Sequence, residues 1–151
     1  MKQPSSAEAA TKKQVILFFA ANPIGIDPLA LDREARSIHG ELRRSGCRDR
    51  FDFVTRWAAE PLDLLHEIRE LKPTVVHFSG HGSASSAEAL RSALGRDISA
   101  EQAAPSANSG GLYFQSAAGA TRLVSPESLA QTFGAAGASV KVVVLNAVTA
   151  R

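Results

Sequence analysis

A short apolar run that ends at a histidine between two glycines places the strongest constraint on the fold. It spans residues 74–83 and reads TVVHFSGHGS. Its first half is mostly β-branched or apolar, which predicts a short buried strand. Gly80 and Gly82 are expected to let the chain turn sharply and to leave the His81 side chain at the carboxyl end of that strand. Because parallel sheets carry their functional groups at that end, His81 is a candidate general base or acid, with a solvated turn histidine as the alternative.

Two more apolar runs predict strands that are covered on both faces and therefore central, at Gln14–Ala21 and Val140–Leu145. Residues 50–58 alternate between apolar and polar side chains, which predicts a strand at the sheet edge. Amphipathic patterns separate these strands and predict helices from Pro28 to Gly46, from Pro61 to Leu71 and from Pro126 onward. Strands that alternate with helices predict an α/β fold with a mostly parallel sheet covered by helices on both faces.

The ends of the helices carry their own signals. Asp27 and Ser125 are candidate N-caps for the first and third helix, each followed by a proline in the first turn. Gly46 is expected to end the first helix, and Gly134 and Gly137 the third.

The remaining segments are accessory. Residues 111–115 and 121–125 flank a turn of small residues and predict a small β-hairpin that stands off the main sheet. Residues 1–13 read as a disordered leader, and residues 83–109 are rich in Ala and Ser and predict a flexible insertion. Residues 14–151, including this insertion, are predicted to form one domain.

Composition excludes several function classes. A net charge of +2, with basic residues dispersed along the sequence, argues against nucleic acid as a partner. No apolar run approaches the length of a membrane span, so we expect no membrane partner. The single cysteine, Cys47, forms no internal disulfide and suits the reducing cytoplasm. No phosphate-binding glycine motif and no metal-ligand spacing occurs, so we expect neither a cofactor nor a metal.

The candidate site follows from the predicted parallel sheet. If the strands that start near residues 74 and 140 are neighbours, residue 148 or its neighbour faces His81 across a cleft. His77 is interpreted as a strand histidine rather than a metal ligand, and Ser79 and Ser83 as turn residues. The acidic candidates near this edge could bind a basic group, although N-capping and solvation explain them more simply: Asp27, Asp32 and Glu34. His39 and His66 are expected on the surface of helices.

The sequence resembles the caspase-like peptidases, and most closely their bacterial CHAT branch. The resemblance rests on HFSGHG at residues 77–82, the GLYF hairpin, VVVLNA at residues 142–147, ILFFAANP at residues 16–23 and the helix LALDREARSI. It covers Gln14 to about Ala147. It implies a caspase-like three-layer sandwich and a His–Cys dyad that cleaves peptide bonds, with His81 as the family histidine. It also implies that the backbone N–H at Gly82 helps form an oxyanion hole.

The sequence departs from this family at the nucleophile. The position that the resemblance assigns to the cysteine holds Val148, and valine cannot attack a carbonyl. The match covers only the amino-terminal, large-subunit portion of the family domain, so we expect a domain that is truncated at the carboxyl end. Neither Cys47, which is expected at the opposite edge of the sheet, nor Thr149, which has no activating group, is a convincing substitute.

Three functional hypotheses follow. The first is an inactive caspase-like domain that binds or regulates a protein or peptide. The second is the large-subunit half of an active His–Cys endopeptidase that needs a cysteine at position 148 and the missing carboxyl-terminal part. The third is a flavodoxin-like binding module. The apolar strand Val140–Leu145 would have an open outer edge in a truncated domain, which predicts a homodimer through this strand.

Overall fold

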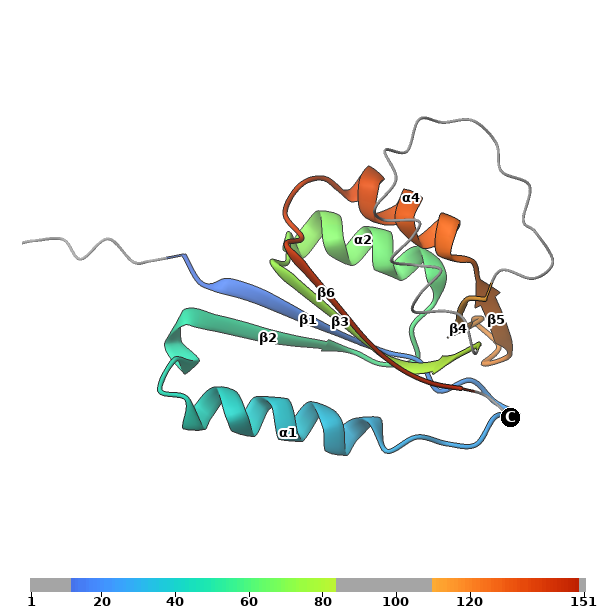
Figure 1. The fold of residues 1–151 in the computed structure, drawn as a ribbon, viewed down its shortest axis with the longest axis horizontal. Coiled ribbons are helices and arrows are strands. Elements are labelled where there is room, and N and C mark those ends of the chain that lie inside the picture. The colour runs from blue at the N-terminus through green and yellow to red at the C-terminus, as the bar shows by residue number, and fades with distance from the viewer. Residues whose placement is uncertain (1–11, 84–109, 150–151) are drawn as a thin grey trace, which may run out of the picture.

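The computed structural model describes residues 12–83 and 110–149 and shows an α/β fold with a six-stranded mixed sheet. Its strands are β1 (Gln14–Ala20), β2 (Phe51–Arg56), β3 (Val75–Gly82), β4 (Leu112–Gln115), β5 (Thr121–Val124) and β6 (Val142–Thr149). Its helices are α1 (Leu31–Arg44), α2 (Pro61–Leu71) and α4 (Pro126–Ala136), with a short 3₁₀ turn, η1, at Arg48–Arg50. Helix α1 covers one face of the sheet, and α2 and α4 cover the other (Figure 1). The predicted three-layer α/β arrangement is therefore present.

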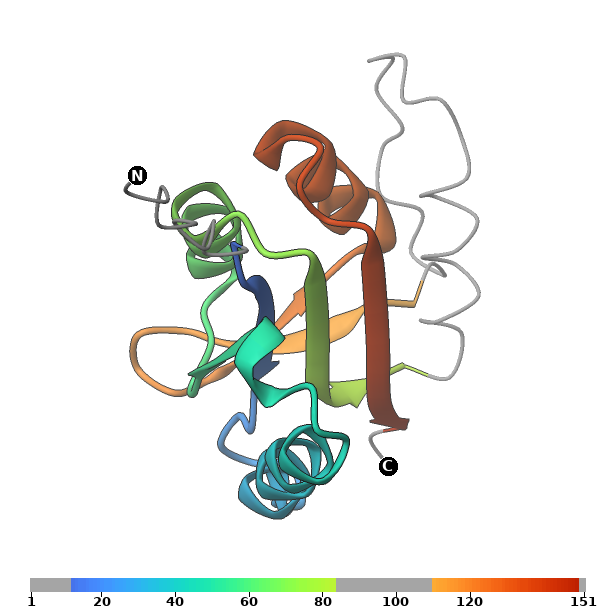
Figure 2. The ribbon, with the colours of Figure 1, turned by 90° about the vertical axis from the view of Figure 1, so that its left-hand side faces the viewer.

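The parallel part of the sheet has the order β2-β1-β3-β6. Figure 2 shows β3 and β6 side by side at one end of this order. Strand β2 pairs only with β1, as its alternating pattern predicted for an edge strand. The β4–β5 hairpin also forms at the predicted place, but it does not stand off the sheet, because Leu112 pairs with Gly82 at the end of β3.

The two faces of the sheet have different cores because side chains alternate along each strand. The larger core lies between the sheet and helices α2 and α4, and its buried residues are Leu17, Phe19, Ala21, Ala59, Leu64, Ile68, Val76, Phe78, Leu112, Phe114 and Leu129. The smaller core lies beneath α1 and consists of Phe18, Ala20, Leu31 and Ala35. Strand β3 contributes Val76 and Phe78 to the larger core, and it turns the polar side chains of His77, Ser79 and His81 toward the α1 face.

The predicted helix ends agree with the structure except at the start of α1 and at Gly134. Helix α2 has the predicted bounds, with Pro61 in its first turn. Helix α1 ends at Arg44, just before Gly46, which has a positive φ of 70°. Helix α4 begins after Ser125, whose side chain accepts a hydrogen bond from the Ser128 N–H, and it continues through Gly134 but ends before Gly137, as predicted for that glycine. The prediction for the start of α1 is wrong, since the helix begins at Leu31 after an Ala30 N-cap that offers no side-chain hydrogen bond. Asp27 is therefore part of the preceding loop.

The predicted turn around His81 is also wrong. Strand β3 continues without a turn through Gly82 because β6 pairs with it over its whole length. Neither Gly80 nor Gly82 has a positive φ angle, so conformational freedom is not why glycine suits position 80. A Cβ atom at Gly80 would lie 2.8 Å from the Ala21 carbonyl oxygen and 3.0 Å from Cζ of Phe78, so steric space is the reason.

This steric limit gives a first prediction. We expect Gly80→Ala to lower the free energy of unfolding by about 1–3 kcal/mol, because a backbone carbonyl cannot move aside cheaply. Gly134→Ala is the matched control. Its Cβ would meet no atom within 4 Å on α4, and it should raise stability by about 0.5–1 kcal/mol. Chemical denaturation of both variants measures the difference, and a neutral Gly80→Ala would contradict the steric argument.

Strand β6 differs from its prediction in two ways. It is longer, running from Val142 to Thr149, and it pairs with β3 alone among the described residues, so it is an edge strand rather than a central one. One of its faces packs toward the larger core through Leu145 and Ala147. The other face is left open, because α1 packs over β1 and β2 rather than over β6.

Other predicted segments are not tested. The leader up to residue 11 and the insertion at residues 84–109 lie outside the described residues. Within the described ranges, no helix combines the length and the apolar character needed to cross a membrane.

Candidate functional site

His81 lies at the carboxyl end of β3 and is buried, with only 3% of its surface exposed. Its imidazole Nε2 is 2.8 Å from the backbone carbonyl oxygen of Asp27, in the loop between β1 and α1. A carbonyl can only accept a hydrogen bond, so Nε2 must carry the proton and donate it. The Asp27 carbonyl thus sets the tautomer and the orientation of the ring.

The second ring nitrogen is left available. In the neutral ring Nδ1 carries a lone pair, and it is buried without a hydrogen-bond partner among the described residues. A buried polar atom without a protein partner costs free energy, and in native structures such an atom marks a strained position, a functional group or a bound water. An imidazole with one nitrogen fixed to a carbonyl and the other free can accept a proton from a neighbouring group.

Val148 on β6 is the residue that pairs with His81. Strands β3 and β6 are adjacent and parallel, which is the condition under which the sequence placed residue 148 or its neighbour opposite His81, and the register pairs Ser79 with Asn146, His81 with Val148 and Gly82 with Thr149. Paired residues of parallel strands lie on the same face, so Val148 lies beside His81 on the α1 face. Its side chain is 48% exposed, so a reactive group at this position would be accessible from solvent. Valine itself supplies no nucleophile.

Gly82, the oxyanion-hole candidate, is buried within the sheet. It has β-ladder partners on both sides, Leu112 of β4 and Thr149 of β6. The structure thus places Gly82 directly after the buried histidine and beside the end of β6.

A polar cluster next to His81 was missed by sequence reasoning. Glu34 of α1 points at the sheet, where its Oε1 lies 2.7 Å from Nε2 of His77 and its Oε2 accepts a hydrogen bond from the Ser79 hydroxyl. The Phe18 ring stacks on the other side of His77, with ring centroids 5.2 Å apart. Glu34 therefore neither caps the helix nor lies in solvent, and Ser79 is a buried strand residue rather than a turn residue.

The environment of Glu34 keeps its carboxylate ionised. Partial burial raises the pKa of Glu34, but hydrogen bonds from Ser79, Asn146 and His77, together with the charge of His77, outweigh it, so the pKa lies below its ordinary value of 4.5. The cluster ties α1 to β3 and β6 at the level just before His81 and Val148. The only sequence signal was the polar alternation of His77, Ser79 and His81 in an otherwise apolar strand.

The structure does not bring the other candidates to the site. Cys47 precedes β2 at the amino ends of the parallel strands, opposite the end that carries His81. Thr149 is exposed and is paired with Gly82 rather than with His81. Ser83 binds the Gly111 N–H through its hydroxyl. Asp32 is exposed at the start of α1.

The two remaining histidines, His39 and His66, lie outside this site. His39 is half-buried, with its ring stacked against Phe53 at a centroid distance of 6.0 Å, and His66 is exposed on α2. Within residues 12–83 and 110–149, no group of three or more His, Cys, Asp or Glu side chains could hold a metal ion.

No protein-family model and no curated protein matches the sequence. The function proposed below therefore rests on the geometry of this site and on the sequence resemblance.

Proposed function

We propose that this chain is an inactive caspase-like domain of the CHAT type that acts in binding, regulation or assembly with a protein or peptide. The observation that carries the proposal is the pairing of His81 with Val148 in adjacent parallel strands. The histidine has the surroundings of a general base, with Nε2 held by the Asp27 carbonyl and Nδ1 free. The position beside it lacks a nucleophile, so peptide-bond cleavage has no attacking group.

The resemblance of the sequence to CHAT domains supports the same reading. In that family the histidine at position 81 and a cysteine at position 148 would form the dyad, and the N–H of Gly82 would help stabilise the oxyanion. The single cysteine, Cys47, lies at the other end of the sheet, so no thiol replaces the missing one. We place the protein in the cytoplasm, where a lone thiol stays reduced.

The two alternatives are less well supported. The parallel strand order β2-β1-β3-β6 also occurs in flavodoxin-like proteins, so strand order alone does not separate the two classes. A flavodoxin-like module would bind its ligand at the loop after β1. Here the Asn22 side chain bridges that loop by accepting from the Leu29 N–H and donating to the Leu29 carbonyl. The active-endopeptidase hypothesis requires a cysteine at position 148, which the sequence lacks.

A cysteine placed at position 148 tests the proposal. In a Cys47→Ser background, we expect the thiol of Val148→Cys to be alkylated by iodoacetamide at neutral pH roughly tenfold faster than an ordinary thiol. An ordinary thiol is only about 3% thiolate at pH 7, and a neighbouring imidazole raises that fraction. Adding His81→Ala should remove the acceleration. The rate is followed by mass spectrometry of the intact protein.

Val142→Cys in the same background is the matched control, because Val142 lies on the same exposed face of β6 and is paired with Val75 instead of a histidine. Its thiol should react at the ordinary rate. Equal rates at positions 148 and 142, or a rate at 148 that does not depend on His81, would contradict the dyad geometry. Labelling of the unmodified protein by a thiol-reactive peptide in a His81-dependent manner would contradict the proposed inactivity.

We also propose that two copies associate through β6. The strand is eight residues long, carries no charge and no proline, and leaves its outer edge unpaired among the described residues. Its open face exposes three valines, Val142 by 49%, Val144 by 38% and Val148 by 48%. Edges of this kind recruit another strand, and pairing of two β6 strands about a two-fold axis is the simplest closed arrangement.

A charge on this edge should block the association. We expect the unmodified protein to dimerise at high micromolar concentration in sedimentation velocity, and Val144→Lys to weaken the dimer about tenfold or more. Leu123→Lys is the control, since Leu123 is 52% exposed on β5, away from this edge. A monomeric protein at these concentrations, or an equal effect of both lysines, would contradict association through β6.

A further inference from the structure

Helix α1 carries four arginines on its outer side. Arg33, Arg36, Arg43 and Arg44 line one hollow on the outer side of this helix, together with Ser37, His39 and Gly40. All four arginines are exposed. Arg44 pairs with Glu41, whereas Arg33, Arg36 and Arg43 form no ion pair among the described residues. No acidic side chain lines the hollow, so three of its four arginines carry a positive charge that no ion pair of the described residues neutralises.

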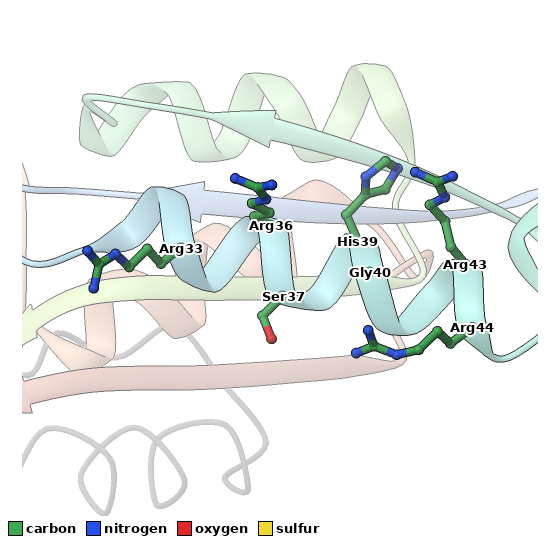
Figure 3. A pocket seen from close by; sticks show the side chains of 7 residues that line it. All are labelled: Arg33, Arg36, Ser37, His39, Gly40, Arg43 and Arg44. Atoms are coloured by element: carbon green, nitrogen blue, oxygen red, sulfur yellow. The ribbon is translucent and has the colours of Figure 1, made fainter.

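Gly40, which has no side chain, lies between the arginines along the helix, and we call the hollow the arginine groove. Figure 3 shows Arg36, His39 and Arg43 projecting on one side of the helix and Ser37 and Arg44 on the other. The only atoms within 4 Å of a Cβ built on Gly40 belong to the Arg44 guanidinium, which lies 3.9 Å away. An elongated ligand can therefore approach the helix near Gly40 while its charges meet Arg36 and Arg43, which project on the same side.

The spacing of the arginines suits two charges on one chain rather than a single small anion. Arg36 and Arg43 are seven residues apart, so their Cα atoms lie roughly 10 Å apart along the helix axis. A second helix with carboxylates two turns apart repeats this spacing, and a small residue such as Gly40 permits close contact between helices. Arginine guanidinium groups bind carboxylates through paired hydrogen bonds.

Three observations disfavour nucleic acid and lipid surfaces as ligands of this groove. The exposed acids Asp32 and Glu41 lie on the same helix beside the groove, so a continuous polyanion such as nucleic acid would meet repulsion on leaving it. The groove also presents no free aromatic ring on which a base could stack, because His39 is stacked on Phe53. The large apolar side chains exposed in the described residues lie outside α1, so this face offers nothing to insert into a lipid surface.

We propose that the arginine groove of α1 docks an acidic helical segment of a protein partner, seated over Gly40 with its carboxylates on Arg36 and Arg43. This surface is separate from the pair His81 and Val148, and its test does not depend on the proposed loss of peptidase activity.

A labelled alanine-based helical peptide with glutamates three and four residues apart is the probe, and fluorescence anisotropy measures its binding at low and at physiological salt. We expect binding that weakens with salt. We expect Arg36→Glu combined with Arg43→Glu to lower the affinity roughly tenfold, since each exposed ion pair contributes a few-fold and the reversed charges repel. Gly40→Leu should also lower the affinity, because it adds a side chain in the middle of the groove without changing the charge.

The matched control is Arg122→Glu combined with Lys141→Glu, which changes the net charge equally at exposed positions outside α1. It should leave binding nearly unchanged. An equal loss in the control, or full binding by Gly40→Leu, would overturn the proposal. Tighter binding of single-stranded DNA or of phosphatidylserine vesicles than of the acidic peptide would overturn it as well. Circular dichroism of each variant verifies that α1 is intact.

Discussion

Phe114→Ala is expected to lower the free energy of unfolding by about 3–5 kcal/mol, the largest effect of any substitution considered for this protein. The Phe114 side chain is completely buried on β4 and packs against Phe19 of β1 and Phe78 of β3, with ring centroids 6.0 and 5.2 Å away. Truncation to alanine leaves a cavity between the hairpin and the sheet. Domains of this size have a total stability of about 5–15 kcal/mol, so the loss is a large fraction of it.

The effect should be concentrated in the hairpin. Few backbone contacts join it to the rest of the protein, among them the pairing of Leu112 with Gly82 and the hydrogen bond from the Gln115 N–H to the carbonyl of Ala59, in the loop before α2. Hydrogen exchange should therefore show faster opening of β4 and β5 than of β1 in the variant. Leu123→Ala on β5 is the control and should cost under 1 kcal/mol, because its side chain is half exposed. Similar losses in the two variants would contradict a core role for Phe114.

Glu34→Ala is expected to have the second-largest effect, a loss of about 2–3 kcal/mol. Removing the carboxylate leaves the His77 imidazole and the buried Ser79 hydroxyl without their partner. It also releases α1 from β3, because the Glu34 carboxylate is the polar link between them. Urea denaturation measures the loss, and Asp32→Ala, which removes an exposed acid two residues earlier on α1, should change stability by less than about 0.5 kcal/mol.

The same carboxylate should make stability depend on pH. The pKa of Glu34 is lower in the folded protein than its ordinary value of 4.5, so the unfolded chain takes up this proton first. The stabilising contribution is therefore complete above about pH 4.5 and is lost as the pH falls through the lower folded pKa. Thermal unfolding between about pH 6 and pH 3 should show a smaller decline for Glu34→Gln than for the unmodified protein. Parallel declines would contradict the role of this carboxylate.

Glu34 also helps to hold the elements of the candidate site in place. Its cluster joins α1, β3 and, through Asn146, β6 two residues before His81 and Val148. The loop that supplies the Asp27 carbonyl leads directly into α1. Loosening α1 should therefore weaken the contact that orients the His81 ring. In the Val148→Cys protein, Glu34→Ala is accordingly expected to reduce the accelerated alkylation as well as stability.

Local sequence signals predicted most elements of the fold. The bounds of α2 follow from Pro61 and its amphipathic stripe, and the start of α4 follows from Ser125 and Pro126. The edge position of β2 was predicted from its alternating pattern, because a strand with one covered face exposes every second side chain. These predictions succeed because capping and periodicity act over a few neighbouring residues.

The failures share a different cause. The turn predicted at Gly80 and Gly82 is absent because β6 pairs with β3 through that point, and glycine fits there to avoid the Ala21 carbonyl. The apolar sequence of β6 predicted a central strand, yet one of its faces is open because α1 lies over other strands. The apolar residues of a strand show how much surface it could bury, but the positions of the neighbouring helices and strands decide how much of that surface is covered.

The sequence by itself determined the alternation of strands and helices and the absence of a nucleophile at position 148, and the pairing of β3 with β6 then placed that position beside His81. Only the tertiary structure decided which groups orient the site. Asp27 and His81 are 54 residues apart and Glu34 and His77 are 43 apart, and no local pattern couples positions so distant. Such contacts form when the packing of α1 on the sheet brings a loop carbonyl and a helix carboxylate to polar side chains that would otherwise lack partners.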